Sequence, residues 1–259
     1  MNIIVCVKQV IDPEAPPSSF SIDTATRTAQ MRGANPVIDP FAEHAVEAAL
    51  RLKDAGQATI TILSMGNNLQ RDVVKKPLAM GADALILLED PAFAGLNAAG
   101  TVAALAAAIR KMSGYDLILC GREASDTNAG QTGPGLAETL GLPCVTLARK
   151  IEARDGSARI ERATSVGYDV VETALPAVVT VSNEIGEARY PTIKGIMSAK
   201  KITPEVWSPA DIGFTGAAGA ELKDLYQPVF EGSCEFIESE TPEEAGEILA
   251  GKLREEKVI

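Results

Sequence analysis

The chain has 259 residues, which is enough for one large α/β domain, alone or with a substantial appendage. Its 35 acidic residues exceed its 24 basic residues, and the formal net charge of -11 argues against general affinity for nucleic acid or anionic membrane surfaces. No apolar run approaches the roughly 20 residues of a membrane span and the N-terminus lacks the basic start of a signal peptide, so we expect a cytoplasmic protein that is not membrane-embedded.

Strands and helices are predicted to alternate through the first 180 residues. The pattern places strands at residues 3–7, 58–64, 84–88 and 116–120 and helices at residues 40–55, 69–80 and 101–111. This βαβ order predicts an α/β fold, a three-layer αβα sandwich around a mostly parallel, Rossmann-like sheet.

A β-hairpin and an extended arm are predicted for the second half of the chain. Alternating residues at 158–165 and 168–175 flank a turn at Val166 and Gly167, and residues 177–182 form a further apolar strand. Beyond about residue 183 the chain is interrupted by proline and glycine, and the small residues at 213–219 indicate an extended C-terminal arm. Thr241 and Pro242 begin a terminal helix that is expected to dock on another surface.

The chain offers few residues for covalent or metal chemistry. Cys6, Cys120 and Cys144 lie in apolar, strand-like surroundings and Cys234 lies in the tail, so we expect buried, reduced thiols and no metal site. His44, the single histidine, lies on the flank of a predicted helix and is the one candidate for an imidazole base. The sequence contains no P-loop, Gly-x-Gly-x-x-Gly or Gly-x-Ser-x-Gly motif.

The segment from Leu117 to Pro134 is the strongest candidate for a ligand site. An apolar strand runs into a polar, glycine-punctuated loop and then into a helix at about residues 133–140. The start of that helix would present unpaired N–H groups and a positive dipole end, which favours an anion. The donors, acceptors and glycines for this site are Gly121, Ser125, Asp126, Thr127, Asn128, Gly130, Gln131, Thr132, Gly133 and Gly135. An ordinary capped βα turn is the alternative.

Several segments, in order along nearly the whole chain, resemble the beta subunit of electron transfer flavoproteins. They are Val7-Lys8-Gln9-Val10, Asp39-Pro40-Phe41, Ala79-Met80-Gly81-Ala82-Asp83, the loop at 126–133, and Leu175-Pro176-Ala177 followed by Arg189-Tyr190. The resemblance implies an adenine nucleotide alpha hydrolase-like fold and a heterodimer with a larger alpha subunit. The FAD of that subunit would accept electrons from acyl-CoA dehydrogenases or similar flavoenzymes, for delivery to a membrane ETF-quinone oxidoreductase.

The resemblance also implies that this chain holds AMP structurally. The AMP-contacting positions would be Cys6, Asp39, Pro40, Phe41, Ala42, Met65, Ala124, Ser125, Asp126, Thr127, Asn128, Ala129, Gly130, Gln131 and Thr132. These positions include the loop that the residues by themselves indicate as an anion site. No catalytic residue is expected in this chain, because electron transfer depends on the position and surroundings of the cofactor.

A second implied feature is a loop at residues 184–201 that anchors partner dehydrogenases. Its contact residues would be Tyr190, Ile193, Ile196, Met197, Lys200 and Lys201. The residues by themselves predict a surface loop with a modest apolar patch and solvated lysines. The expected organisation is therefore an α/β nucleotide-binding domain at 1–183, the recognition loop at 184–201, and at 202–259 an arm and helix that pack on the alpha subunit.

The identity of the nucleotide stays open between two alternatives. Bifurcating members of the family hold a second FAD in place of AMP and oxidise NADH, and their loop resembles Asp-Gly-Asp-Thr-Ala-Gln-Val-Gly. Asn128 and Thr132 differ from that loop, and the Thr132 hydroxyl can donate to a terminal phosphate where valine cannot, which favours AMP. Against AMP, Asp39 is a poor neighbour for a phosphate, and residues 190–197 also resemble anaerobic members of the family, which include bifurcating ones.

Two interpretations from other classes are retained. Similar αβα layering with a phosphate loop occurs in ATP-hydrolysing and universal-stress-like proteins, which would make the chain an adenine nucleotide sensor or an ATP-dependent enzyme. Such proteins usually carry a phosphate motif near the first strand, and residues 7–12 contain neither glycine nor serine. The other interpretation is a pure assembly protein with a vestigial pocket.

Overall fold

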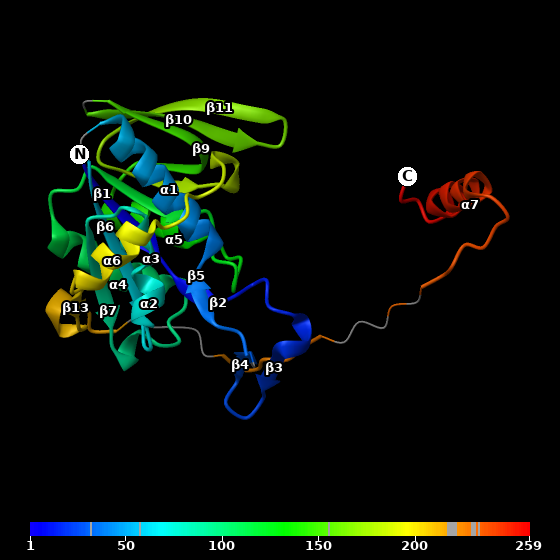
Figure 1. The fold of residues 1–259 in the computed structure, drawn as a ribbon, viewed down its shortest axis with the longest axis horizontal. Coiled ribbons are helices and arrows are strands. Elements are labelled where there is room, and N and C mark those ends of the chain that lie inside the picture. The colour runs from blue at the N-terminus through cyan, green and yellow to red at the C-terminus, as the bar shows by residue number, and fades with distance from the viewer. Residues whose placement is uncertain (32, 57, 155, 217–221, 229–231, 233) are drawn as a thin grey trace.

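The computed structural model describes residues 1–31, 33–56, 58–154, 156–216, 222–228, 232 and 234–259 (Figure 1). Within these residues, nine strands form one central sheet. From one edge to the other they are β11 (Gly167–Ala174), β10 (Ser157–Thr164), β9 (Cys144–Arg154), β12 (Ala177–Val181), β8 (Leu117–Gly121), β1 (Asn2–Val7), β6 (Thr59–Gly66), β7 (Ala84–Glu89) and β13 (Glu205–Trp207).

The sheet is mostly parallel, which confirms the predicted α/β class. All pairs from β9 through β13 are parallel, and β10 and β11 continue the sheet in antiparallel fashion beyond β9. The predicted hairpin is β10 and β11, and β9 extends it to three strands. The central strands are apolar on both faces, as parallel strands covered by helices on both sides must be.

Helices cover the two faces of the sheet. On one face, α1 (Pro40–Ala55), α3 (Lys76–Met80) and α6 (Ile193–Lys201) pack into one apolar cluster with the strands. On the other face, α4 (Ala98–Met112) and α5 (Thr132–Leu140) pack into a second cluster. The predicted helix α1 buries one face, because Ala45, Ala49 and Leu52 lie in the first cluster. The small alanines let this helix pack closely on the sheet.

The helix predicted at residues 69–80 is interrupted. It consists of α2 (Arg71–Val74) and α3, separated at Lys75. Pro77 explains the break, because proline has no N–H for the helix ladder and its ring clashes with the carbonyl four residues earlier. Pro77 lies in the first turn of α3, where proline is tolerated.

Two small antiparallel ladders follow β1. β2 (Gln9–Ile11) pairs with β5 (Pro36–Ile38), and β3 (Phe20–Asp23) pairs with β4 (Thr28–Met31) as a hairpin that projects from the body in Figure 1. Short 3₁₀ turns occur at η1 (Pro17–Ser19), η2 (Pro91–Phe93), η3 (Asn183–Ile185) and η4 (Ala210–Ile212).

The C-terminal region divides differently from the expectation. β13 adds to the sheet beside β7, and Ile212 and Phe214 are buried in the second apolar cluster. The expected boundary at residue 202 therefore falls inside the α/β unit. Residues 217–219 of the expected small-residue stretch lie outside the described residues. Among those described, no helix is long and apolar enough to cross a membrane.

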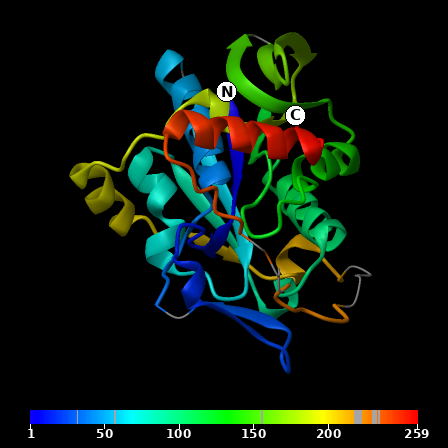
Figure 2. The ribbon, with the colours of Figure 1, turned by 90° about the vertical axis from the view of Figure 1, so that its right-hand side faces the viewer.

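The terminal helix α7 (Pro242–Glu255) stands apart from the body in Figure 1 and lies in front of it in the view of Figure 2. Its predicted cap is present, since Thr241 Oγ1 accepts a hydrogen bond from the Glu244 N–H at 3.2 Å. None of its residues is buried. A capped amphipathic helix with no buried face presents an apolar surface without a partner.

The cysteine prediction is half right. Cys6 and Cys120 are buried, whereas Cys144 and Cys234 are exposed. Cys144 is the first residue of β9, and a strand end has less cover than a strand centre.

Replacement of Gly195 by alanine tests how α6 is seated on the body. A Cβ at this position would lie 2.1 Å from the Ala79 carbonyl oxygen of α3, so α6 would have to move. We expect Gly195→Ala to lower the free energy of unfolding by about 1–3 kcal/mol in denaturant titrations. Gly246→Ala in α7 is the control, because open space surrounds that position, and we expect it to be neutral or to stabilise by up to about 1 kcal/mol.

Candidate functional site

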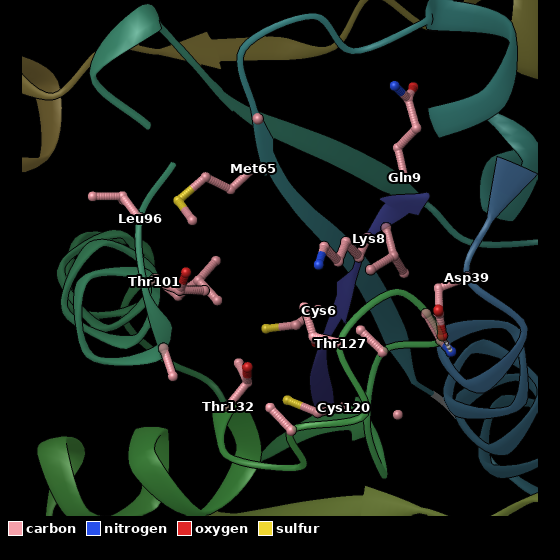
Figure 3. A pocket seen from close by; sticks show the side chains of 18 of the residues that line it. Cys6, Lys8, Gln9, Asp39, Met65, Leu96, Thr101, Cys120, Thr127 and Thr132 are labelled. Carbon is pink, nitrogen blue, oxygen red and sulfur yellow. Dashed lines mark hydrogen bonds between the residues drawn. The ribbon is translucent and has the colours of Figure 1, made fainter. Parts of the chain in front are cut away.

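A cavity of about 590 Å³ lies at the carboxyl ends of the parallel strands (Figure 3). Its floor is formed by Cys6 at the end of β1 and Cys120 in β8, which are register partners on neighbouring strands. From β1 the chain proceeds to β6 and β7 on one side and then returns to β8 on the other. The cavity therefore occupies the topological switch point, where open α/β sheets bind ligands.

The structure brings most of the predicted nucleotide positions together around this cavity. Those in its wall are Cys6, Asp39, Ala42, Met65, Ala124, Thr127, Ala129, Gly130, Gln131 and Thr132. Pro40, Phe41, Ser125, Asp126 and Asn128 lie outside the wall.

Asp39 is the buried polar centre of the site, with 1% of its surface exposed. Its Oδ1 accepts the N–H groups of Phe41 and Ala42 at 2.9 and 3.3 Å and thereby caps α1. Its Oδ2 accepts both the N–H and the hydroxyl of Ser125 at 2.7 Å. Because the first N–H groups of α1 are bound by Asp39, they are not offered to an anion. The carboxylate instead ties α1 to the loop after β8.

The loop at residues 122–131 is shaped by its own hydrogen bonds. The N–H groups of Thr127 and Asn128 donate to the Ala124 carbonyl at 3.1 and 2.8 Å, and Asn128 has a φ of 47°. Asparagine tolerates this left-handed conformation better than most residues, which gives Asn128 a structural role in the turn. Lys8, which lines the cavity, binds this loop through an ion pair with Asp126 at 2.6 Å.

Three glycines expected to let a ligand approach the backbone also allow close packing contacts, and Gly121 lines the cavity as well. A Cβ on Gly121 would lie 2.7 Å from the backbone of Phe41, and one on Gly133 would lie 2.3 Å from Thr180 Cγ2. A Cβ on Gly135 would lie 2.8 Å from Val102 Cγ2. These glycines therefore let α1 approach β8 and let α5 approach β12 and α4.

Two helix starts lie in the wall of the cavity. At α4, the Asn97 side chain accepts the Gly100 N–H at 2.9 Å. At α5, Gln131 makes no side-chain capping bond, and Gln131 and Thr132 line the cavity. The start of α5 is therefore the better anion site, because no side-chain cap accepts hydrogen bonds from its first N–H groups or offsets the positive end of its dipole.

Sequence reasoning missed one side of the cavity. It is lined by the end of β6, the loops that follow β6 and β7, and the start of α4, namely Gly66, Asn67, Asn68, Leu69, Phe93, Ala94, Gly95, Leu96, Asn97, Ala98 and Thr101. Polar residues directly after two further parallel strands were the available signal, since all these carboxyl ends meet at one edge of the sheet.

The two thiols on the cavity floor are suited to packing against a ligand rather than to reacting with one. The hydrogen bond between Cys120 and the Cys6 side chain, and then burial, raise the pKa of the Cys120 thiol well above its usual range. A thiol that stays protonated is a poor nucleophile and metal ligand. Among the described residues, no group of three or more His, Cys, Asp or Glu is placed to hold a metal ion. His44 lies away from the cavity, with Nδ1 3.2 Å from the Gly186 carbonyl oxygen.

The predicted recognition segment is a helix where a loop was expected. Thr192 caps α6 by accepting the Gly195 N–H at 3.0 Å. The apolar side chains stay exposed: Tyr190 by 89%, Ile193 by 81%, Ile196 by 43% and Met197 by 62%. Lys200 and Lys201 lie in the last turn of the helix, where they complement its dipole.

A buried carboxylate in α1 holds the chain that leads into α6. Glu47 is 4% exposed, and its oxygens accept the N–H of Arg189 at 3.1 Å and its Nε at 2.8 Å. Arg51 also donates to Glu47 at 2.9 Å, and Arg189 reaches Asp54 at 2.8 Å. Since a buried charge is stable only when paired and hydrogen-bonded, this cluster fixes the position of residues 185–189 against α1.

Comparison with known proteins identifies the family. A model of the electron transfer flavoprotein domain matches residues 27–212. The chain belongs to the family of electron transfer flavoprotein beta subunits. It is 36% identical to the beta subunit of Thermoanaerobacterium thermosaccharolyticum over 98% of this chain and 94% of that one.

Other relatives are similar at comparable levels. The caffeyl-CoA reductase-Etf complex subunit CarD of Acetobacterium woodii is 34% identical over the full length of both chains. Protein FixA of Azorhizobium caulinodans is 34% identical over 82% of this chain and 77% of that one.

Removal of the Asp39 carboxylate should destabilise the protein. In Asp39→Ala the N–H groups of Phe41, Ala42 and Ser125 lose their partner, so we expect a loss of at least about 2 kcal/mol in the free energy of unfolding. Ser125→Ala, which removes only the hydroxyl bond, should cost about 1 kcal/mol. Equal losses in the two variants would contradict the central role of Asp39.

The buried ion pairs of Glu47 predict that the free energy of unfolding decreases at acidic pH. Burial raises the pKa of Glu47, and hydrogen bonds from Arg189 and Arg51 outweigh it, so the pKa in the folded state lies below the ordinary value of 4.5. The stabilisation is therefore present above pH 4.5 and is lost as the pH falls through the folded pKa. In urea titrations at several pH values, the stability gap between the parent protein and Glu47→Gln should narrow below pH 4.5. A gap that is constant with pH would contradict this assignment.

Proposed function

We propose that the chain is the beta subunit of a heterodimeric electron transfer flavoprotein and binds AMP in the 590 Å³ cavity. The observation that carries the proposal is the coincidence of this cavity, at the switch point of the sheet, with the positions that family resemblance assigns to the nucleotide. The cavity size is ordinary for a small-molecule site, which is about 300–1,000 Å³.

The residues present fit an adenosine monophosphate. The start of α5 and the Thr132 hydroxyl supply donors for the phosphate, while Cys6, Met65 and Ala42 supply apolar surface for a base or sugar. The charge of Asp39 is directed at four protein donors, which lessens its repulsion of a phosphate.

In this proposal the chain sets the position and the surroundings of the cofactors and carries out no acid–base chemistry of its own. In the heterodimer the FAD shared with the alpha subunit supplies the one- and two-electron chemistry when bound. This chain holds its nucleotide, provides a rigid α/β body beside the flavin and presents α6 to partners. The partners in this proposal are the alpha subunit, acyl-CoA dehydrogenases or similar flavoenzymes as donors, and a membrane ETF-quinone oxidoreductase as acceptor.

A second candidate is a bifurcating beta subunit that holds its own FAD and oxidises NADH. One observation favours it: the cavity extends beyond the AMP positions to residues 66–69 and 93–98, which leaves room for a larger ligand. The full-length relative CarD, a subunit of a caffeyl-CoA reductase-Etf complex, is consistent with such a complex. Thr132 argues for AMP, because a hydroxyl at this position can donate to a terminal phosphate.

The deciding experiment is extraction of nucleotides from the heterodimer after co-expression with an alpha subunit. One FAD and one AMP per heterodimer would support the first candidate, and two FAD would support the second. A colourless monomer that hydrolyses ATP would contradict both and favour an ATP-dependent enzyme.

Thr132→Val should loosen the hold on AMP while the flavin stays in place. We expect AMP content to fall severalfold on extensive dialysis, because loss of a hydrogen bond to a charged group costs about 1.5–3 kcal/mol. Chromatography of nucleotide released by denaturation measures the outcome. Thr101→Val is a control, because Thr101 also lines the cavity but belongs to α4. Unchanged AMP content in Thr132→Val would contradict the hypothesis that this residue binds the phosphate.

A further inference from the structure

The residues that directly follow β1 connect two loops in the wall of the 590 Å³ cavity. Lys8 and Gln9 both line the cavity, and Figure 3 shows them on the same side of it as Asp39. One of the two loops follows β8 and leads to Gln131, and the other follows β6 and includes Asn68. The contacts of residues 8 and 9 with these loops therefore decide whether this side of the wall stays closed.

Each of the two side chains binds a different loop. Lys8 Nζ lies 2.7 Å from Oδ1 and 2.6 Å from Oδ2 of Asp126, in the loop after β8. Gln9 Nε2 donates to the Asn68 carbonyl oxygen at 3.1 Å, and Gln9 Oε1 accepts the Gln70 N–H at 2.7 Å. Residues 8 and 9 thus join the loop at 122–131 to the chain at 68–70.

The backbone at residues 8 and 9 is fixed, whereas the ion pair reaches solvent. The Lys8 carbonyl oxygen accepts the Asp39 N–H at 2.8 Å, and Gln9 begins β2, which pairs with β5. The side chains of Lys8 and Asp126 are 45% and 39% exposed. Exposed ion pairs contribute little free energy and are weakened by salt. The pair can therefore separate while the backbone beneath it stays in place.

We propose that Lys8 and Gln9 form a latch on this cavity, and that the ion pair between Lys8 and Asp126 must separate before bound AMP leaves. Separation frees the loop at 122–131 from residue 8, so that the loop moves away from the ligand together with Gln131. Ionic strength then controls the rate of nucleotide exchange, because salt screens an exposed pair. The proposal rests on the proposed function, because it takes the occupant of the cavity to be AMP.

The competing explanation is that the two charges act on the phosphate directly. Lys8 would then attract the phosphate and Asp126 would repel it. Removal of the lysine charge would speed release, and removal of the carboxylate charge would slow it. A latch predicts faster release in both cases, because either change breaks the same ion pair.

The first test measures release of radiolabelled AMP from the heterodimer, co-expressed with an alpha subunit, after dilution into excess unlabelled AMP. We expect Lys8→Gln and Asp126→Asn each to raise the release rate about two- to fivefold at low salt, which is the range for loss of an exposed ion pair. The double variant should release AMP no faster than the single variants, because the pair is already broken in each. Slower release from Asp126→Asn, or multiplied effects in the double variant, would overturn the proposal.

A matched control separates the latch from an ordinary surface ion pair. Lys53 and Asp83 form an ion pair at the same distance of 2.6 Å and with similar exposure, and neither residue lines the cavity. Lys53→Gln should leave the AMP release rate unchanged, although its effect in urea titrations should resemble that of Lys8→Gln. An equal acceleration of release in Lys53→Gln would overturn the proposal.

Salt provides the second test. At about 1 M salt, where charges interact only within about 3 Å of screening length, the parent heterodimer should release AMP as fast as Lys8→Gln. A difference between the two that persists at high salt would overturn the proposal. A parent heterodimer that does not retain labelled AMP through gel filtration would instead refute the proposed nucleotide site, and the latch with it. Retention of AMP with equal release rates in the parent and both variants would refute the latch alone.

Discussion

The buried carboxylate of Asp39 is the point on which the site depends. It joins the first turn of α1 to the loop that follows β8, two segments separated by 86 positions in the chain. A carboxylate with almost no exposure is stable only when its lone pairs are used, and Asp39 uses them on four protein donors. The same bonds occupy the first N–H groups of α1, so the start of α5 is the better candidate for an anion site.

α1 carries a second buried carboxylate two turns further on. Glu47 binds Arg189 as Asp39 binds Ser125, so one helix positions both the wall of the 590 Å³ cavity and the chain that enters α6. This arrangement keeps the cavity and the partner-facing helix in fixed relation to the same sheet. In the function that we propose, the rigidity of this frame, and not a catalytic side chain, sets the distances between cofactors and partners.

Charge is distributed unevenly between the chain as a whole and the two regions that α1 positions. The chain as a whole is acidic, yet Lys75, Lys76 and Lys200 lie together beside α6, and the start of α5 lies in the wall of the cavity. An acidic protein with local cationic sites discriminates among partners by repelling most anionic surfaces and admitting those that fit. Glycines at positions 121, 133 and 195 allow the close contacts that place these sites.

The sequence by itself determined the parallel α/β sheet and the buried face of α1, because these follow from periodicity. It also determined the capped α7 and the loop at 122–131, because these follow from residues adjacent in the chain. Tertiary structure alone decided that α6 is a helix seated on Ala79, that β13 completes the sheet, and that Gly121 and Gly133 admit packing. It also decided that Glu47 pairs with Arg189, 142 positions away. The physical reason is that contacts between distant segments leave no periodic trace in the sequence, since each depends on where the rest of the chain has brought its partner.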